Sequence, residues 1–269
     1  MISNMIRNIV LDERIKDKSI DRDSEELLRV HLEIIKSKKI IHNVFEEFYD
    51  ICNNLKNKYF IKSDKKIIEL GAGVSFIKDK YPNIITSDIK NYEGVDIVVN
   101  AQEMQFKDSE VNTFYGINCF HHFPEPRKFF MELDRTLEDG GGAILIEPYY
   151  GWFSNILYKK VHEDEFFYKE QKNWETGQNE NQFMTGANQA LSYLIFIRDR
   201  EIFEKEFPNL VIEDTIIINN YMRYLVSGGV NFKQLLPTFM EKPIKFFEFL
   251  LSPLNKIFAL HYAIVIRKK

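Results

Sequence analysis

The architecture of this chain can be worked out from one stretch, Lys65-Lys66-Ile67-Ile68-Glu69-Leu70-Gly71-Ala72-Gly73-Val74-Ser75. A short apolar run ends in an acidic residue and then in two glycines separated by one residue. This order predicts a buried strand over Lys66–Leu70 and a tight turn that opens a short helix over Ser75–Lys80. Glycine suits a turn where backbone passes close to a ligand, because a Cβ would clash there. Such strand–turn–helix joints bind nucleotide-like ligands at the carboxyl end of a parallel sheet.

Apolar segments alternate with helical ones in the 80 residues that follow. Proline at Pro124 and Pro126 starts a helix that Asp139-Gly140-Gly141-Gly142 ends. The fifth apolar segment is almost free of polar residues, as in a strand covered on both faces. After the first strand we predict strands over 83–87, 96–100, 113–120 and 143–147. The alternation predicts an α/β fold, a Rossmann-like, doubly wound and mostly parallel sheet.

The flanking regions are different in character. Apolar residues at helical spacing between Asp23 and Leu55 predict helices in an N-terminal segment, 1–63, with Asp23 or Ser24 as the first cap. The α/β domain is assigned to 64–269. After strand five we expect a helical or irregular insertion. Within this domain, the later segments are an irregular stretch 149–196, a helix 199–207, a strand 210–218, a helical insertion 219–258 and a last strand 259–267.

The overall composition excludes several classes of protein. The 269 residues are 45% hydrophobic and 28% charged, enough for a soluble globular core. A net charge of −4 gives no general case for nucleic-acid binding. Two distant cysteines, Cys52 and Cys119, favour a reducing compartment, and we expect a cytoplasmic protein. We see no signal peptide and no apolar run long enough for a membrane span.

Polar and small residues follow each predicted strand. Because the carboxyl ends of parallel strands share one edge, we expect these residues to line one crevice. Asp88 ends strand two, 17 residues after Gly71, where a carboxylate can accept hydrogen bonds from two ribose hydroxyls. The other strands end at the glycine loop, at Ala101-Gln102, at Asn118 to His122 and at Glu147-Pro148.

These motifs resemble those of class I S-adenosylmethionine-dependent methyltransferases, in particular the branch that acts on small molecules. The resemblance covers roughly residues 64–150. The family's acidic residue and GxGxG loop stand here as Glu69, Gly71, Gly73 and Ser75, with serine in place of the last glycine. The segment before its Leu-Pro-Phe appears as Asn100-Ala101-Gln102-Glu103-Met104-Gln105-Phe106. The fourth-strand motif appears as Asn118-Cys119-Phe120-His121-His122-Phe123.

The resemblance implies S-adenosyl-L-methionine as cofactor. It places the ribose-binding acid on Asp88. Asn100 stands where the family usually has an acid, so the adenine amino group is expected to meet Gln102 or backbone instead. The implied cofactor-binding residues are Glu69, Gly71, Ala72, Gly73, Asp88, Ile89, Ala101, Gln102 and Asn118.

Two other interpretations of the glycine loop, a nicotinamide-binding motif and a P-loop, are disfavoured. A nicotinamide-binding fingerprint needs a third glycine, and that position is Phe76, which would obstruct close packing of helix on strand. A P-loop needs Gly-Lys-Ser/Thr, which does not follow the glycines.

Histidines supply the candidate catalytic groups. His121 and His122 are adjacent and should point in different directions, one toward the acceptor as a general base and the other packed or solvated. Methyl transfer needs mainly in-line alignment, and removal of a proton if the nucleophile is a hydroxyl. Val161-His162-Glu163-Asp164-Glu165 could ligate a metal, but a solvated helix start is the preferred interpretation, and we predict no metal site.

Acceptor and partner are less determined by the sequence. Amides and rings are mixed between Trp174 and Tyr193, and we expect 149–196 to form a lid over a small-molecule or glycan acceptor. Residues 233–269 carry seven Lys/Arg against two acids, and 233–258 is largely apolar, so this part could contact an anionic membrane, or equally form a core or dimer helix. Three hypotheses follow: methyl transfer, most simply at oxygen; a cofactor-binding relative without turnover; and a peripheral membrane enzyme acting on a lipid-linked acceptor.

Overall fold

The computed structural model describes residues 9–16, 24–73, 75–161, 166–175 and 187–269. Ser24 begins the first long helix, since its hydroxyl accepts from the Leu27 N–H at 3.3 Å, and Pro126 opens α4 as the sequence predicts. The helical elements are η1 (Glu13–Ile15), α2 (Glu25–Ser37), α3 (Lys39–Tyr59), η2 (Ile77–Asp79), η3 (Phe120–His122), α4 (Pro126–Thr136), α5 (Trp152–Val161), α6 (Leu191–Tyr193), η4 (Leu194–Arg198), α7 (Arg200–Glu206), α8 (Tyr221–Ser227), η5 (Thr238–Met240), α9 (Glu241–Leu250), η6 (Ser252–Leu254) and α10 (Asn255–Phe258).

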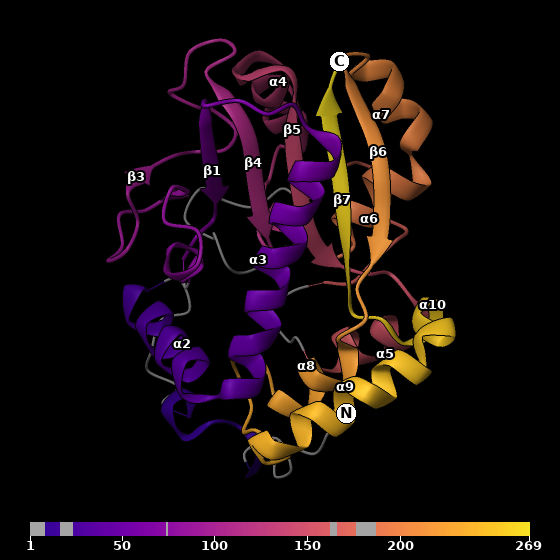
Figure 1. The fold of residues 1–269 in the computed structure, drawn as a ribbon. Helices are drawn as coiled ribbons and strands as arrows, with labels where there is room; N and C mark the ends of the chain where they lie inside the picture. Colours follow the sequence, from indigo (N-terminus) through magenta and orange to yellow (C-terminus); the bar gives the residue numbers. More distant parts are fainter. Residues whose placement is uncertain (1–8, 17–23, 74, 162–165, 176–186) are drawn as a thin grey trace.

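One seven-stranded sheet forms the centre of the molecule, in the order β3-β2-β1-β4-β5-β7-β6 (Figure 1). β1 to β5 are parallel, and β7 runs antiparallel to both of its neighbours. The strands are β1 (Lys66–Leu70), β2 (Ile85–Asp88), β3 (Ile97–Val98), β4 (Val111–Ile117), β5 (Leu137–Pro148), β6 (Leu210–Ile217) and β7 (His261–Lys268). The chain order reverses between β1 and β4, which is where such sheets open a crevice for a ligand.

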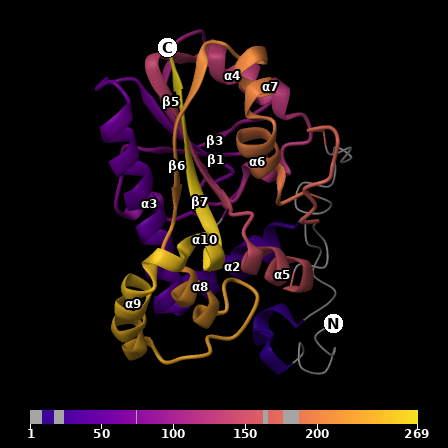
Figure 2. The ribbon, with the colours of Figure 1, turned by 90° about the vertical axis from the view of Figure 1, so that its right-hand side faces the viewer.

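Helices cover both faces of the sheet (Figure 2). On one face, Val44, Phe48 and Cys52 of α3 pack with Tyr115 and Ile144 from the strands. On the other face, aromatic side chains of α4, η4 and α7 pack against the alternate strand residues, among them Phe129, Phe130, Phe196 and Phe203. Each such ring contributes about 1.5–3 kcal/mol when fully buried, so both layers are firmly attached. The expected α/β architecture is confirmed.

Most predicted elements are present, with shifted ends. β1 has the bounds that the sequence predicts, whereas β3 contains only two residues. The helix expected over Ser75–Lys80 is wrong: the chain forms only the three-residue 3₁₀ turn η2. The reason lies in Phe76, whose ring stacks on His42 and meets Tyr49 edge-on, holding this segment against α3 instead of letting it wind further.

The three glycines after α4 do not end the helix, which stops at Thr136 before them. They lie inside β5, where the pairing with β4 shifts register between Val111 and Thr113. Gly142 is required there, because a Cβ would lie 2.2 Å from the Ile266 carbonyl oxygen and 2.4 Å from the Phe60 ring. The glycines therefore serve close packing between strands and α3's end rather than helix termination.

The shorter helices gather at one end of the molecule. In Figure 1, β1, β4 and β5 point toward the end occupied by α2, α5, α8, α9 and α10. The N-terminal part reaches the same end, where Asp12 N–H donates to the Asn231 carbonyl at 3.0 Å and Lys233 N–H donates to the Val10 carbonyl at 2.7 Å. Within the described ranges, no helix is both long and apolar enough to cross a membrane.

Candidate active site

The glycine loop ties together the ends of three strands. Gly71 and Gly73 have φ of +62° and +35°, which favour glycine. The Ala72 N–H donates to the Ser87 carbonyl at 2.8 Å, and the Gly73 N–H donates to Asp88 Oδ2 at 2.9 Å. A Cβ on Gly71 would lie 2.6 Å from Cys119 Cβ, so Gly71 is needed for contact with β4's end as well as for its backbone conformation.

Glu69 is buried beneath this loop, at 3% exposure. Its pKa is raised to about 8, chiefly by burial; a hydrogen bond with Ser75 opposes the rise and the charge of Asp88 adds to it. Its Oε2 atom is buried and has no hydrogen-bond partner among the described residues. An unpaired buried carboxylate oxygen is costly, and it is a ready acceptor for a ligand's donor.

Ser75, the departure from the glycine motif, is held by α3. Its Oγ lies 3.3 Å from the Tyr49 hydroxyl and accepts from the Ile77 N–H at 3.1 Å. The Tyr49 hydroxyl also accepts from the Phe76 N–H at 3.2 Å. Serine therefore replaces glycine with a side chain that fixes the loop to the neighbouring helix.

Asp88 ends β2 half-buried and faces the glycine loop. Besides the Gly73 N–H, its carboxylate accepts from the Lys90 N–H at 3.4 Å. Burial raises the pKa of Asp88, and these backbone donors oppose the rise. Each carboxylate oxygen accepts more than one hydrogen bond, so capacity for further donors remains. Ile89, the next residue, is 36% exposed and presents apolar surface beside it.

The segment after β3 is a tight turn. Asn100 Oδ1 accepts from the Gln102 N–H at 3.0 Å, so the residue that replaces the family's acid closes this turn. Ala101 is buried, and Gln102 Oε1 accepts from the Glu125 N–H at 2.6 Å. The side-chain oxygen of Gln102 thus binds the start of α4, and only its amide NH₂ group remains for recognition of a ligand.

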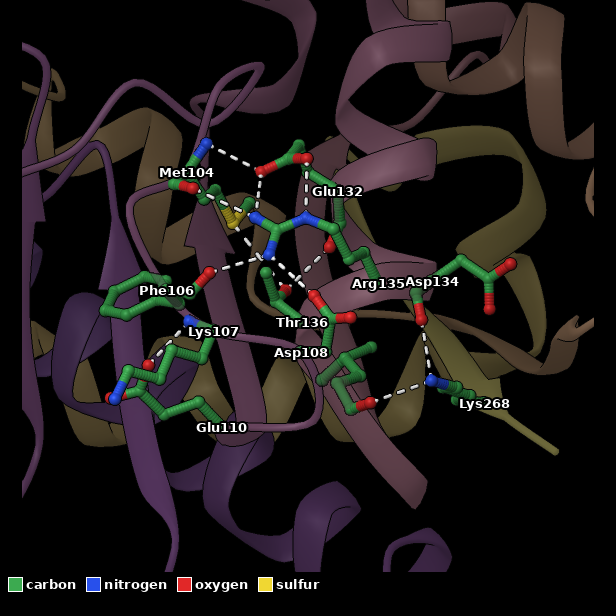
Figure 3. Close-up of polar contacts among 11 residues, drawn as sticks. Met104, Phe106, Lys107, Asp108, Glu110, Glu132, Asp134, Arg135, Thr136 and Lys268 are labelled. Atoms are coloured by element: carbon green, nitrogen blue, oxygen red, sulfur yellow. Dashed lines mark hydrogen bonds and ion pairs between the residues drawn. The ribbon is translucent and has the colours of Figure 1, made fainter.

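Glu132 and Arg135 of α4 clamp the backbone that continues from this turn (Figure 3). Arg135 donates to the Met104 carbonyl at 2.9 Å and to the Phe106 carbonyl at 2.7 Å. Glu132 accepts from the Met104 N–H at 2.7 Å and pairs with Arg135 at 2.7 Å, which lowers the pKa of Glu132. Charge-assisted hydrogen bonds are roughly twice as strong as neutral ones, so this clamp holds residues 104–106 firmly.

The loop after β4 carries Asn118 and both histidines. Asn118 has φ of +52°, and its N–H donates to the Ile146 carbonyl at 2.8 Å. Its side-chain Oδ1 is buried and, like Glu69 Oε2, has no hydrogen-bond partner among the described residues. Two unsatisfied acceptor oxygens therefore lie at the ends of the two strands that flank the switch point.

Glu147 at the end of β5 organises the histidine loop. It is completely buried, and one oxygen accepts from the N–H groups of Cys119 at 3.1 Å and Phe120 at 2.9 Å. The other oxygen lies 2.6 Å from His121 Nδ1. This contact fixes the orientation of the His121 ring.

The two histidine rings do not point in different directions, contrary to expectation. Their centroids lie 4.2 Å apart with the ring planes tilted by 39°, and both residues belong to the short turn η3. His121 is buried at 3% exposure, whereas His122 is half-buried. The pair therefore has one deeply held ring and one more accessible ring.

Trp174 and Asn188 of the expected lid contact other residues of the protein. Trp174 is buried in the core, donates to Asp199 Oδ2 at 2.9 Å and lies under the Arg127 guanidinium at 4.2 Å. Asn188 accepts from the Tyr168 and Ala190 N–H groups and donates to the Tyr168 carbonyl. These two polar side chains are internal rather than parts of a sugar pocket. The remaining amides of 176–186, and the possible metal ligands 162–165, lie outside the described residues.

Sequence reasoning missed the residues that support the site. Tyr49 comes from a helix that the motifs do not include, and Leu28 of α2 lies 3.6 Å from the Cβ position of Gly73. Glu132 and Arg135 have the i, i+3 spacing of a helical ion pair, but their main partners are backbone groups. Such partners carry no sequence signal.

One family model matches the chain. It is described as a methyltransferase domain and matches residues 77–145. The match begins at η2, just after the glycine loop, and ends within β5. This match agrees with the predicted resemblance to class I S-adenosylmethionine-dependent methyltransferases over that segment, and S-adenosylmethionine is the cofactor that such a methyltransferase domain would use. No curated protein matches it.

Solved structures with a similar fold are distant in sequence. Geranyl diphosphate C-methyltransferase from Streptomyces coelicolor is 12% identical, with a TM-score of 0.48 over 85% of this chain and 81% of that one. Phosphoethanolamine N-methyltransferase 2 from Haemonchus contortus is also 12% identical, with a TM-score of 0.43 over 81% of this chain and 52% of that one. At this distance neither identifies the acceptor.

Proposed function

We propose that the enzyme transfers a methyl group from S-adenosylmethionine to a small-molecule acceptor, most simply at oxygen. The observation that carries the choice of oxygen is the His121–Glu147 pair, with 2.6 Å between Nδ1 and Oε2. A hydroxyl nucleophile must lose a proton, and an imidazole oriented by a carboxylate accepts one near neutral pH. His121 and His122 are the proposed proton acceptors, with Glu147 as the group that positions His121.

The residues at the strand ends fit the cofactor. S-adenosylmethionine supplies a methyl group on a sulfonium sulfur, together with an ammonium group and two ribose hydroxyls that need acceptors. Glu69 Oε2 and Asn118 Oδ1 are buried acceptors that have no hydrogen-bond partner among the described residues, which suits the ammonium group. We assign the ribose to Asp88, the methionine side to Gly71, Ala72 and Gly73, and the adenine side to Ile89, Ala101 and Gln102.

The acceptor class is proposed from the sequence of 149–196, where amides and rings are mixed, and not from Trp174 and Asn188, which are internal. We retain a small molecule or a glycan precursor as the acceptor, and propose a cytoplasmic enzyme because Cys52 and Cys119 are both free and buried. A lipid-linked acceptor is the second candidate. It is favoured by one observation, the exposed phenylalanines of α9.

Calorimetry with S-adenosylhomocysteine tests the cofactor assignment. We expect binding that Asp88→Ala abolishes and that Asp88→Asn weakens, because an amide keeps one acceptor oxygen but loses the charge. Asp139→Ala serves as control, because it removes an 83% exposed carboxylate near the start of β5, at the opposite end of that strand from Glu147. No binding by the wild-type protein would overturn the proposal.

The pH profile of methyl transfer tests the histidines. His122→Gln should lower the rate and His121→Gln should also remove the acidic limb of the profile, while S-adenosylhomocysteine binding stays. Cofactor binding without transfer to a broad panel of hydroxyl acceptors would instead favour a cofactor-binding relative without turnover.

A further inference from the structure

The outer side of α9, η6 and α10 exposes an unusual number of large apolar side chains. Six of them, between 40% and 69% exposed, form what we call the aromatic surface: Phe246, Phe247, Phe249, Leu250, Leu254 and Ile257. Scattered single apolar residues are ordinary on a protein surface, but a contiguous set marks an interaction site.

The polarity of α9 is inverted relative to a helix that faces water. Its buried residues are Ile244 and Glu248, one turn apart, and its phenylalanines face outward. Glu248 is 1% exposed and binds Arg223 through both the backbone N–H at 2.9 Å and Nε at 2.6 Å. A surface helix of a globular protein normally buries its apolar side and exposes its charges.

Buried contacts fix this orientation. Asn219 donates to the Glu248 carbonyl at 2.8 Å, and Asn43 of α3 donates to Glu241 at 2.7 Å. Rotating α9 to hide its phenylalanines would carry Glu248 away from Arg223 and leave this buried guanidinium with Glu47 alone, which is strongly destabilising. The outward rings are therefore a property of the fold.

Charge identifies the partner. Lys242, Lys245 and Lys256 are exposed on the same helices, while both acids of α9 are bound by groups of the protein body. Apolar side chains bordered by lysines match the boundary of an anionic phospholipid bilayer, where rings enter the acyl region and each cation near the surface contributes about 1 kcal/mol.

Helix α5 extends this surface. Phe153 of α5 contacts Phe258 of α10 edge-on at 5.9 Å, and Trp152 is 66% exposed. Ile156, one turn further, is also exposed, as are Lys159 and Lys160 at the end of the helix. Tryptophan is enriched where protein meets the headgroup region, so α5 repeats the chemistry of α9 and α10.

The aromatic surface lies at the same end of the molecule as the candidate active site. Figures 1 and 2 show α5, α9 and α10 at the end of the molecule toward which β1, β4 and β5 point. We propose that the aromatic surface, with Trp152 of α5, docks the enzyme on an anionic phospholipid membrane. A second copy of the chain is the less suitable occupant, because it would bring lysines against lysines.

Vesicle sedimentation tests this proposal with the full chain. We expect binding to vesicles of phosphatidylcholine mixed with phosphatidylglycerol, and much weaker binding to phosphatidylcholine alone. The double variants Phe246→Ser/Phe249→Ser and Lys242→Glu/Lys245→Glu should each lose about tenfold or more in partitioning. The control Met131→Ser/Ile202→Ser removes two apolar side chains exposed on α4 and α7 and should bind as wild type.

Calorimetry with S-adenosylhomocysteine on the same variants shows whether they are folded, because a folded variant should bind this ligand as the wild type does. The same measurement separates membrane docking from the proposed function. Vesicle binding by a chain that binds no S-adenosylhomocysteine would contradict only the proposed function. Equal binding of all variants, or a dimer in light scattering that dissociates in Phe246→Ser/Phe249→Ser without any vesicle binding, would overturn membrane docking.

Discussion

Glu69 at the end of β1 and Glu248 on α9 are both almost fully buried, and burial raises the pKa of each. Their surroundings differ. Glu248 has Arg223 at both oxygens, whereas Glu69 Oε2 has no hydrogen-bond partner among the described residues. A satisfied buried carboxylate holds elements together, and an unsatisfied one is retained where a ligand supplies the missing donor. The comparison separates a carboxylate that holds α9 in place from one that is open to a ligand at the end of β1.

The largest effect is expected when the satisfied carboxylate is removed. Glu248→Leu leaves the Arg223 guanidinium buried with only Glu47 as partner, at 2.6 Å, and should lower the free energy of unfolding by about 3 kcal/mol. Urea denaturation measures it. The double variant Arg223→Met/Glu248→Leu should recover much of the loss, and equal losses in both variants would show that the pair is not the cause.

Glu69→Gln should raise the free energy of unfolding, unlike Glu248→Leu, and the size of the gain should depend on pH. The folded-state pKa of Glu69 is raised from 4.5 to about 8, so the unfolded chain releases this proton at lower pH than the folded chain. The contribution of Glu69 to stability is full below pH 4.5 and is lost as pH rises to 8. Glu69→Gln should therefore gain about 2.5 kcal/mol relative to wild type between pH 5 and pH 7 in denaturation experiments. A pH-independent difference would contradict a raised pKa.

Arg135 has hydrogen-bond partners at the proposed cofactor site, and its loss should affect both the stability of the protein and its binding of S-adenosylhomocysteine. Arg135→Met removes the hydrogen bonds to the Met104 and Phe106 carbonyls and should cost about 2 kcal/mol in stability. Loosening of the segment 100–106 should weaken S-adenosylhomocysteine binding about tenfold, which calorimetry measures. The control Arg29→Met breaks an exposed ion pair with Glu25 on α2 and should change neither stability nor binding. An equal effect of Arg29→Met would show that Arg135 has no special role.

Sequence patterns predicted the elements whose signals are local. β1 is an apolar run closed by glycine, and α4 begins at a proline, so both starts were found. Gly140–Gly142 were misassigned because their small size serves contacts with residues far away in sequence. Gly140 lies against Ile61, Gly141 against the Asn112 carbonyl of β4, and Gly142 against β7 and Phe60. The clamp of Arg135 was invisible for the same reason.

In the candidate site, too, features with a local sequence signal were predicted, and features that depend on distant residues were not. The order of the motifs brought Gly71, Asp88 and Glu147 to one edge, as parallel strands require, and the contacts of Cys119 with Gly71 and Glu147 join them. The direction of α9 could not be foreseen, because a pattern of mixed lysine and phenylalanine does not say that a glutamate lies inside. The side of that helix that is buried is decided by residues distant in sequence, above all Arg223.

Helix α3 contacts both regions that the comparison separates. Glu47 on this helix binds Arg223, and Tyr49, two residues later, holds Ser75 and Phe76 at the glycine loop. An α-helix resists bending over so short a length, so a tilt of α3 displaces both contacts together. Helix α3 thus couples the ion pair that orients α9 to the hydrogen bonds that hold the glycine loop, through two side chains only two positions apart.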